Sequence, residues 1–242
     1  SVVPPEVRVY VFGGAQHRPA PGPSDRGQQP PNPNNYRPFQ EALFLAMDRW
    51  VTDGSEPPPS VHPRVADGTL VHWNEDKSGW RSLPGVAYPT VIQQPEYLNY
   101  GSSFECCRRI DQHPPERSGK FYGMGVPRFD ADNNELGVLR LPRITVPVST
   151  YTGWNLRNSA IGADTELLDL RGSHILFPSN VEERERTGDP RAALTQRYAS
   201  FTDYRDQYIY AAEQLVTERY LLPEHLAILE MVADGYRSLF EP

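Results

Sequence analysis

The feature that most constrains the fold is a short apolar run near the start of the sequence, residues 7–12 (VRVYVF). Its β-branched and aromatic residues predict a β-strand. Nearly every residue in it is apolar, which is typical of a strand buried on both faces, as in a parallel sheet. Gly13 and Gly14 end the run. Because a parallel strand needs neighbours, we expect this one to pair with residues outside this sequence.

A loop and an amphipathic helix follow the strand. The loop, residues 15–36, is dense in Pro, Gly, Asn and Gln. Pro38 suits the first turn of a helix, and Gly54 is a typical helix stop. Apolar residues between them recur at spacings of three and four: Phe39, Leu43, Ala46, Met47 and Trp50. Strand, loop and helix in this order predict an α/β fold.

The middle of the chain, residues 55–172, has a different character. Proline is frequent, with 25 in the whole sequence, and it disfavours helices, so we expect ordered loops and short strands. Strand candidates lie at 85–92, 122–129, 136–141 and 144–147. Residues 130–135 (DADNNE) resemble the start of a calcium loop but lack its glycine and final glutamate. They therefore predict a hairpin turn.

The last part, residues 173–242, is predicted to be helical. Ser179 and Glu182 have the spacing of a capping box for a short helix that ends at Gly188. Further helix starts are predicted at Asp189-Pro190, Thr202 and Pro223. We therefore divide the chain into a core segment at 1–54, a loop-rich region at 55–172 and a helical region at 173–242.

Composition excludes several classes of function. The formal net charge of −7 argues against a nucleic-acid groove, which needs a basic stripe. No apolar stretch approaches the roughly 20 residues that span a bilayer. The six histidines form no His-x-x-x-His pair, so we expect no metal site. Gly123 and Gly125 lack the third glycine of a dinucleotide fingerprint, and we expect no cofactor. The first residues do not form a signal peptide. Localisation is unknown because we expect the N-terminus of the protein to be missing from this sequence, and a secreted or periplasmic location stays open.

His17 is the sharpest candidate for catalysis. It follows the predicted strand within Gly13-Gly14-Ala15-Gln16-His17, and the carboxyl ends of such strands hold active sites in open α/β sheets. In α/β-hydrolases the catalytic triad runs nucleophile, acid, histidine along the chain. The alternative is a loop histidine that makes a structural hydrogen bond.

The nucleophile is missing from this pattern. No Gly-x-Ser-x-Gly elbow occurs in the 242 residues, so an ordinary triad cannot be assembled from this sequence alone. Cys106 and Cys107 are an alternative nucleophile pair, but no cysteine-protease signature surrounds them. We expect them to be inert and, as neighbours, not to form a disulfide with each other.

A second notable run, residues 148–157 (VSTYTGWNLR), joins aromatics to amides and an arginine. Such a mixture can line a substrate pocket, or it can fasten two layers of the fold together. On the first interpretation Tyr151, Trp154 and Asn155 bind substrate. Tyr151 or Trp154 then faces the cleft that holds His17, and Trp154→Ala changes the Michaelis constant more than stability.

Several longer segments together resemble the "alpha/beta hydrolase domain-containing" family. They are VRVYVFGGAQH, PNPNNYRPFQEALFLAMDRWVTDG, PRVADGTLV, FDADNNELGVLRLPRITVPVSTYTGWNLR, GDPRAALTQRYAS and LLPEHL. The resemblance covers nearly the whole chain. It implies an esterase, a nucleophile elbow in a part absent here, and a catalytic role for His17, which stands where the family has its AQH- or TQH-type histidine.

Two hypotheses follow. The first is the C-terminal part of an α/β-hydrolase fold with a loop- and proline-rich middle and a helical end. It cleaves carboxylic esters by a Ser-His-acid triad, with a small-molecule ester as substrate. The nucleophile then lies on an N-terminal segment or a companion chain. The second hypothesis is a non-enzymatic subunit or cover domain that binds a partner through its aromatic loops.

Overall fold

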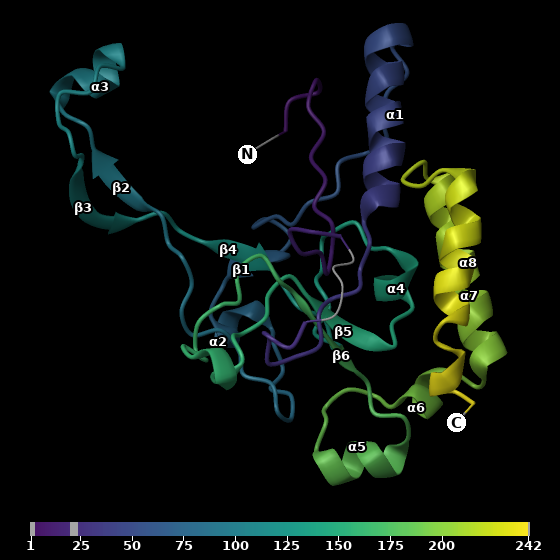
Figure 1. The fold of residues 1–242 in the computed structure, drawn as a ribbon. Helices are drawn as coiled ribbons and strands as arrows, with labels where there is room; N and C mark the ends of the chain where they lie inside the picture. The colour runs from purple at the N-terminus through teal and green to yellow at the C-terminus, as the bar shows by residue number, and fades with distance from the viewer. Residues whose placement is uncertain (1–2, 20–23, 242) are drawn as a thin grey trace.

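The computed structural model describes residues 3–19 and 24–241; the ends and part of the predicted 15–36 loop lie outside this range. Helices outweigh strands, and no large sheet forms within the described part (Figure 1). The helices are α1 (Arg37–Asp53), α2 (Glu75–Ser78), α3 (Ser102–Cys107), α4 (Pro142–Thr145), α5 (Val181–Thr187), α6 (Leu194–Arg197), α7 (Phe201–Thr217) and α8 (Leu226–Asp234). Single 3-10 turns lie at Ser159–Ile161, Pro223–His225 and Arg237–Leu239.

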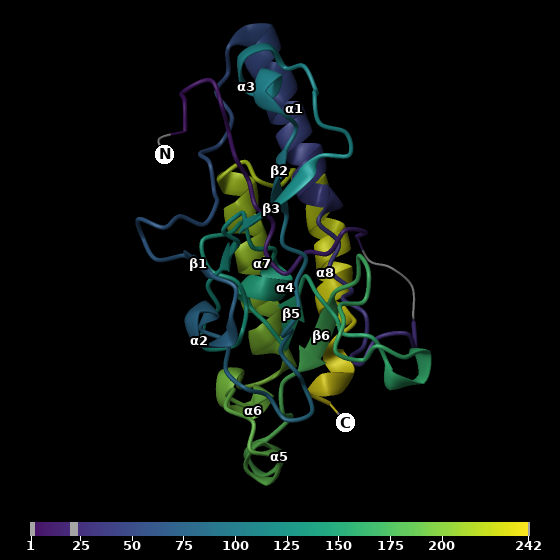
Figure 2. The same ribbon diagram turned by 90° about the vertical axis from the view of Figure 1, so that its left-hand side faces the viewer.

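The named strands form three separate antiparallel pairs. They are β1 (Leu70–His72) with β4 (Gly125–Pro127), β2 (Glu96–Asn99) with β3 (Glu116–Phe121), and β5 (Ser149–Thr152) with β6 (Ser173–Leu176). Only β5 is buried along its whole length. The β5–β6 pair lies at the centre of the molecule, beside α7 and α8 in both views (Figures 1 and 2).

The predicted strand at residues 7–12 is extended but pairs at only two points. Val9 and Val11 exchange backbone hydrogen bonds with Val61, and Val11 and Gly13 do so with Leu139, both in parallel. All these contacts use odd-numbered residues, so they lie along one edge. The side chains are half-buried, or more exposed at Val7, rather than buried on both faces.

The other edge of this segment is open. In the described ranges, the backbone groups of Arg8, Tyr10 and Phe12 make no hydrogen bond. These even-numbered residues point their N–H and C=O groups away from Val61 and Leu139. A further parallel strand would satisfy them.

The main core joins α1 to the helical end of the chain. Phe39 of α1 packs under Phe12, with ring centroids 5.5 Å apart. Tyr204 and Tyr208 of α7 are fully buried, and α7 packs along α8 and against α4. The helical C-terminal part therefore shares one core with the segment that leads to His17.

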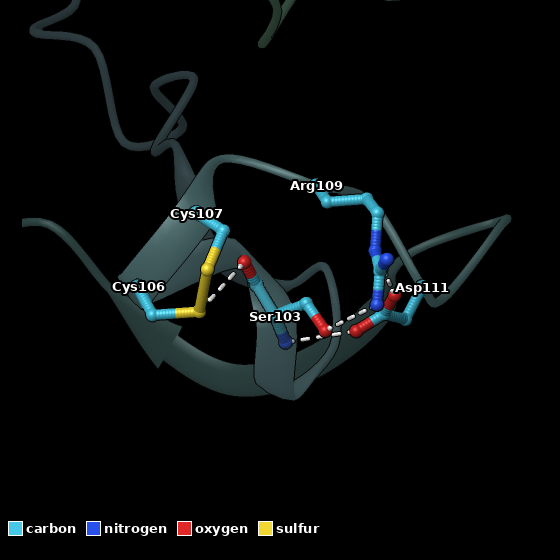
Figure 3. Close-up of a disulfide and its surroundings, with 5 residues drawn as sticks. All are labelled: Ser103, Cys106, Cys107, Arg109 and Asp111. Carbon is cyan, nitrogen blue, oxygen red and sulfur yellow. Dashed lines mark hydrogen bonds and ion pairs between the residues drawn. A yellow bond between two sulfur atoms is a disulfide. The ribbon is translucent and has the colours of Figure 1, made fainter.

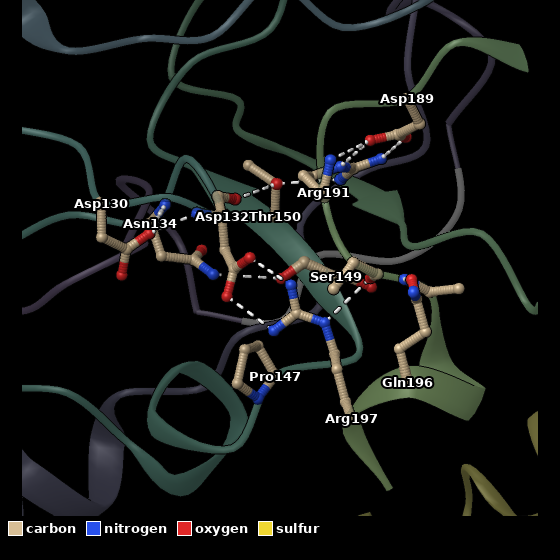
Figure 4. Close-up of polar contacts among 12 residues, drawn as sticks. Asp130, Asp132, Asn134, Pro147, Ser149, Thr150, Asp189, Arg191, Gln196 and Arg197 are labelled. Carbon is tan, nitrogen blue, oxygen red and sulfur yellow. Dashed lines mark hydrogen bonds and ion pairs between the residues drawn. The ribbon is translucent and has the colours of Figure 1, made fainter. Parts of the chain in front are cut away.

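Polar side chains beside β5 form two ion pairs (Figure 4): Arg191 with Asp189, which is buried, and Arg197 with Asp132, which is partly exposed. Arg191 is 2% exposed and makes five hydrogen bonds, two of them to the carboxylate of Asp189. Its other acceptors are the hydroxyl of Thr150 and the carbonyls of Ile175 and Leu176. Asp189 thus holds Arg191 and does not start a helix; α6 begins only at Leu194, which corrects the predicted helix start there.

An arm made of β2, α3 and β3 extends away from the body (Figure 1). Every residue of β3 is exposed, and the rings of Tyr97 and Tyr122 stack 3.8 Å apart at its base. At its tip Cys106 and Cys107 form a disulfide with each other (Figure 3). The expectation of two unlinked cysteines was wrong: the two adjacent residues at the end of α3 are joined through their sulfur atoms.

Other local predictions were shifted or wrong. Residues 144–147 do not form a strand: α4 includes Ile144, and the strand comes later, at β5. Residues 85–92 carry only one bridge, between Leu83 and Val86. The turn at 130–135 is confirmed, since the Asp130 carboxylate accepts hydrogen bonds from the backbone of Asp132 and Asn134.

Across the described residues, no helix is both long and apolar enough to cross a membrane.

Candidate functional site

The loop that carries His17 is held by close packing at Gly14. Its φ of +53° is strained for other residues. A Cβ there would lie 2.7 Å from the Ile144 side chain and 2.9 Å from the Cβ of Tyr151. Only glycine therefore allows the backbone to pass between α4 and β5 at this position. This packing fixes the place where the loop begins.

Buried amides hold the carbonyl oxygens of the loop. The amide nitrogen of Asn32 donates to Gly14 and Thr152, at 2.7 and 2.9 Å. The amide nitrogen of Asn34 donates to Gly13 and Gly14. Both asparagines are almost fully buried, so the loop backbone is fixed from the side of α1.

A carboxylate holds the opposite side of the loop. Glu135 accepts a 2.8 Å hydrogen bond from the backbone N–H of Gly14. Burial raises the pKa of Glu135 to about 7, although the Gly14 hydrogen bond and the charge of Arg140 act to lower it. This is the most perturbed carboxyl group next to the candidate site.

Gln16, directly before His17, anchors the end of the loop. Its side chain is buried; it accepts from the N–H of Gly172 and donates to the carbonyl of Asn32. His17 itself is exposed, and its carbonyl accepts a 2.8 Å hydrogen bond from the Tyr36 hydroxyl. Its imidazole makes no hydrogen bond to any described residue. A fixed backbone thus presents a free imidazole.

The run 148–157 lies against this loop. A Cβ on Gly153 would lie 2.7 Å from the carbonyl oxygen of Ala15. Tyr151 is fully buried, with its hydroxyl 3.2 Å from that of Tyr236. The side chain of Asn155 is buried and exchanges two hydrogen bonds with the backbone of Gln29.

Trp154 faces a different set of aromatics. Its ring centroid lies 5.4 Å from that of Trp80 and 5.7 Å from that of Tyr88. Trp154 stays half-exposed, whereas Trp80 is buried and contacts Phe129 edge-on. Of the three predicted substrate residues, Trp154 alone therefore keeps an accessible ring.

Two cavities, of about 510 and 540 Å³, lie elsewhere in the fold. One separates α1 from residues 216–224, and the other separates residues 138–146 from α7. No residue of the loop at 13–17 lines either of them. Among the described residues, no group of three or more His, Cys, Asp or Glu side chains could hold a metal ion.

Sequence reasoning missed the residues that hold the loop. Glu135 is 121 residues from Gly14, and its sequence neighbours indicate only a turn. The asparagines of PNPNN gave a better signal, because polar amides concentrated before a helix often bind a nearby backbone.

A model of the family described as "Alpha/beta hydrolase domain" matches residues 7–230. The chain belongs to this family. The match begins at the segment that leads to His17 and ends within α8, so nearly the whole chain is alpha/beta hydrolase domain. No curated protein and no solved structure matches the chain.

Replacing Glu135 by glutamine should change how stability depends on pH. The unfolded carboxyl titrates near 4.5 and the folded one near 7. The folded state therefore binds more protons between these values, and Glu135 costs stability as the pH rises through them. Glutamine keeps an acceptor for the Gly14 N–H without the charge.

In urea unfolding, Glu135→Gln should be more stable than wild type by on the order of 1–2 kcal/mol at about pH 8, and should gain little at about pH 5. Glu116→Gln, on the exposed strand β3, is the control and should show no such difference. A gain for Glu135→Gln that is equal at both pH values would contradict the buried-carboxyl interpretation.

Proposed function

We propose that this alpha/beta hydrolase domain is part of a serine hydrolase that cleaves carboxylic esters, with His17 as its catalytic base. The observation that carries the proposal is the exposed imidazole on a loop fixed by Glu135, Asn32 and Asn34. A general base must reach its partner at a fixed distance, so a rigid backbone under a free ring suits it.

The nucleophile is proposed to lie outside these 242 residues, on an N-terminal segment or a companion chain. Two observations support this: the sequence has no Gly-x-Ser-x-Gly elbow, and the backbone of Arg8, Tyr10 and Phe12 leaves an open edge. A parallel strand on that edge would end beside the loop of His17, where a nucleophile elbow is needed. In this arrangement residues 1–54 belong to the catalytic core, while 55–172 and 173–242 cover it.

The proposed reaction has two halves. The serine hydroxyl attacks the ester carbonyl carbon while Nε2 of His17 takes its proton, and the departing alkoxide receives that proton as the C–O bond breaks. Water then attacks the acyl-enzyme and loses a proton to His17, and His17 returns that proton to the serine oxygen as the acyl C–O bond breaks and the acid product leaves. A carboxylate would orient the imidazole.

For the substrate pocket we propose that Trp154 provides an apolar wall. Its half-exposed ring and the contact of Gly153 with Ala15 support this. Tyr151 and Asn155 would shape the pocket from beneath, by holding β5 and the loop at Gln29 in place.

The direct test is hydrolysis of p-nitrophenyl acetate and butyrate by the complete protein. We expect turnover well above the buffer rate, and a Trp154→Ala variant with a raised Michaelis constant. Tyr97→Phe, on the exposed arm, is the matched control and should behave as wild type. Absence of turnover for a range of acyl chain lengths would contradict ester hydrolysis.

The exposed arm favours a second candidate, a subunit that binds a partner. Leu98, Ile110 and Phe121 are each at least two-fifths exposed on it, and such surfaces often contact other chains. Intact-mass analysis of the native protein separates the two proposals. A companion chain with a Gly-x-Ser-x-Gly elbow supports the hydrolase, and a companion without one supports the binding subunit.

A further inference from the structure

The disulfide at the tip of the arm joins the two cysteines of the sequence, Cys106 and Cys107 (Figure 3). They are neighbours in the chain. A disulfide stabilises a fold mainly by restricting the unfolded chain, and this effect falls as the loop that it closes becomes shorter. A bond between neighbours closes the shortest possible loop, so this disulfide adds little to the stability of the fold.

The same disulfide is open to solvent. Both cysteines are exposed, and so are the residues that follow them, up to Ile110. Because the arm extends away from the body (Figure 1), a reducing molecule can reach the sulfur atoms without any movement of the core. Exposed disulfides are the ones that thiols open readily, and they are the regulatory or catalytic ones more often than the structural ones.

The disulfide also lies where helix α3 ends. Cys106 and Cys107 are the last two residues of α3. Consecutive side chains of an α-helix point about 100° apart, so a bond between two of them does not suit a helix that continues past them. The chain leaves α3 at Arg108 with a φ of +54°, a left-handed conformation that residues other than glycine rarely adopt. The Arg108 N–H donates a 3.0 Å hydrogen bond to the carbonyl of Phe104 there.

The other contacts at the tip of the arm are polar and exposed. The N–H of Ser103 donates to the carboxylate of Asp111 at 2.8 Å, and the Arg109 guanidinium pairs with the same carboxylate at 3.3 Å. Arg109 also donates to the hydroxyl of Ser103. Exposed polar pairs of this kind contribute little in water. The covalent bond is therefore the strongest constraint on the way the chain leaves α3.

We propose that Cys106 and Cys107 form a thiol–disulfide switch that sets the conformation at the end of α3, with a dithiol as its reductant. A thiolate of the dithiol attacks one sulfur of the disulfide, and the other cysteine leaves as a thiolate and takes up a proton. The second thiol of the reductant then attacks the mixed disulfide and releases the first cysteine. Two electrons pass to the protein, which gains two thiols, while the dithiol becomes a disulfide.

Reduction should change the surface that the arm presents. Without the bond, the left-handed conformation at Arg108 loses its main constraint, and residues 106–110 become free to rearrange. Ile110, which is 53% exposed, would move with them. This inference does not depend on the proposed hydrolase function, and its tests need no enzymatic readout.

The first test locates the thiols of the complete protein, purified without reductant. Iodoacetamide should label neither Cys106 nor Cys107 before treatment with dithiothreitol, and should label both after it, as seen in the mass of the arm peptide. The double variant Cys106→Ser/Cys107→Ser should keep the wild-type thermal midpoint, because the bond adds little stability. Free thiols at these positions before reduction, or a midpoint that falls steeply in the variant, would overturn the proposal.

The second test follows the conformation of the arm by limited digestion with trypsin, which cleaves after arginine. Wild-type protein that has been reduced and alkylated should be cut after Arg108 and Arg109 roughly tenfold faster than the disulfide form, since cleavage follows the population of opened backbone. The double serine variant should be cut at the fast rate without any reduction.

Cleavage after Arg186 is the internal control of this digestion. Its side chain is 72% exposed on α5, far from the arm in the sequence, so its rate should be the same in every sample. If the disulfide form and the reduced form are cut after Arg108 and Arg109 at equal rates, the disulfide does not control the arm and the proposal fails.

Discussion

Replacing His17 by alanine in the complete protein is expected to lower kcat/KM for p-nitrophenyl esters by several orders of magnitude, roughly 10⁴-fold. Loss of a triad base removes proton transfer in both halves of the reaction. The thermal midpoint should barely move, because the imidazole is exposed and makes no hydrogen bond to a described residue. The Tyr36 hydroxyl bonds the backbone carbonyl at this position, which alanine keeps.

His113→Ala is the matched control for this experiment. His113 is exposed on the arm, so its loss should leave both kcat/KM and the midpoint unchanged. If His17→Ala keeps activity within a few-fold of wild type, His17 is a structural loop residue. If instead the midpoint falls steeply, the loss of activity reflects unfolding.

Replacing Arg191 by methionine is expected to cost about 3–5 kcal/mol of the free energy of unfolding, the usual cost of breaking a buried ion pair from one side. The carboxylate of Asp189 would lose its partner. Burial acts to raise the pKa of Asp189, yet the hydrogen bonds from Arg191 hold that pKa below its usual value. Without Arg191 the enclosed carboxylate would have to stay ionised without a partner or take up a proton, and the carbonyls of Ile175 and Leu176 would each lose a hydrogen bond.

Urea unfolding measures this effect, with Arg186→Met as its control. The Arg186 side chain is 72% exposed and its ion pair with Glu183 is 4.0 Å long, so its loss should cost little. The double variant Asp189→Asn/Arg191→Met should recover part of the lost stability by removing the unpaired charge. A cost for Arg191→Met no larger than that for Arg186→Met would contradict the structural role described here.

The sequence predicted the helices whose ends are set by residues close by in the chain. Helix α1 has Pro38 in its first turn and ends at Gly54 in the left-handed conformation, as proline and glycine preferences require. Helix α5 likewise ends at Gly188, but its cap is Asn180, one residue after the predicted Ser179. Neighbouring polar residues offer competing caps, so the start of a helix is predicted less well than its presence.

Predictions failed where distant contacts decide the structure. Residues 144–147 are apolar and β-branched, yet the proline at position 142 starts helix α4 there, and packing of α4 on α7 stabilises it. At Asp189 a helix start was predicted, but Arg191 takes both carboxylate oxygens. Short apolar runs and single capping residues fit more than one structure, so tertiary contacts choose between them.

For the candidate site, too, the sequence predicted the local feature, the position of His17, and did not predict the long-range contacts around it. The place of His17 follows from a strand and two glycines, all within eleven residues of sequence. The contacts that fix its loop join residues that are far apart in sequence. Glu135 accepts a hydrogen bond from Gly14, and Asn32 donates to the carbonyls of Gly14 and Thr152. No spacing rule connects residues 121 positions apart, so these contacts required the structure.

The most direct test of the central claim is to label the complete native protein with a fluorophosphonate and to map the modified residue by mass spectrometry of its peptides. The reagent reacts with a serine only when a neighbouring base activates it. We predict a single labelled serine in a Gly-x-Ser-x-Gly sequence outside these 242 residues, with labelling lost in His17→Ala and kept in His113→Ala. Label on a serine within this sequence, or labelling that is unchanged in His17→Ala, would contradict the account.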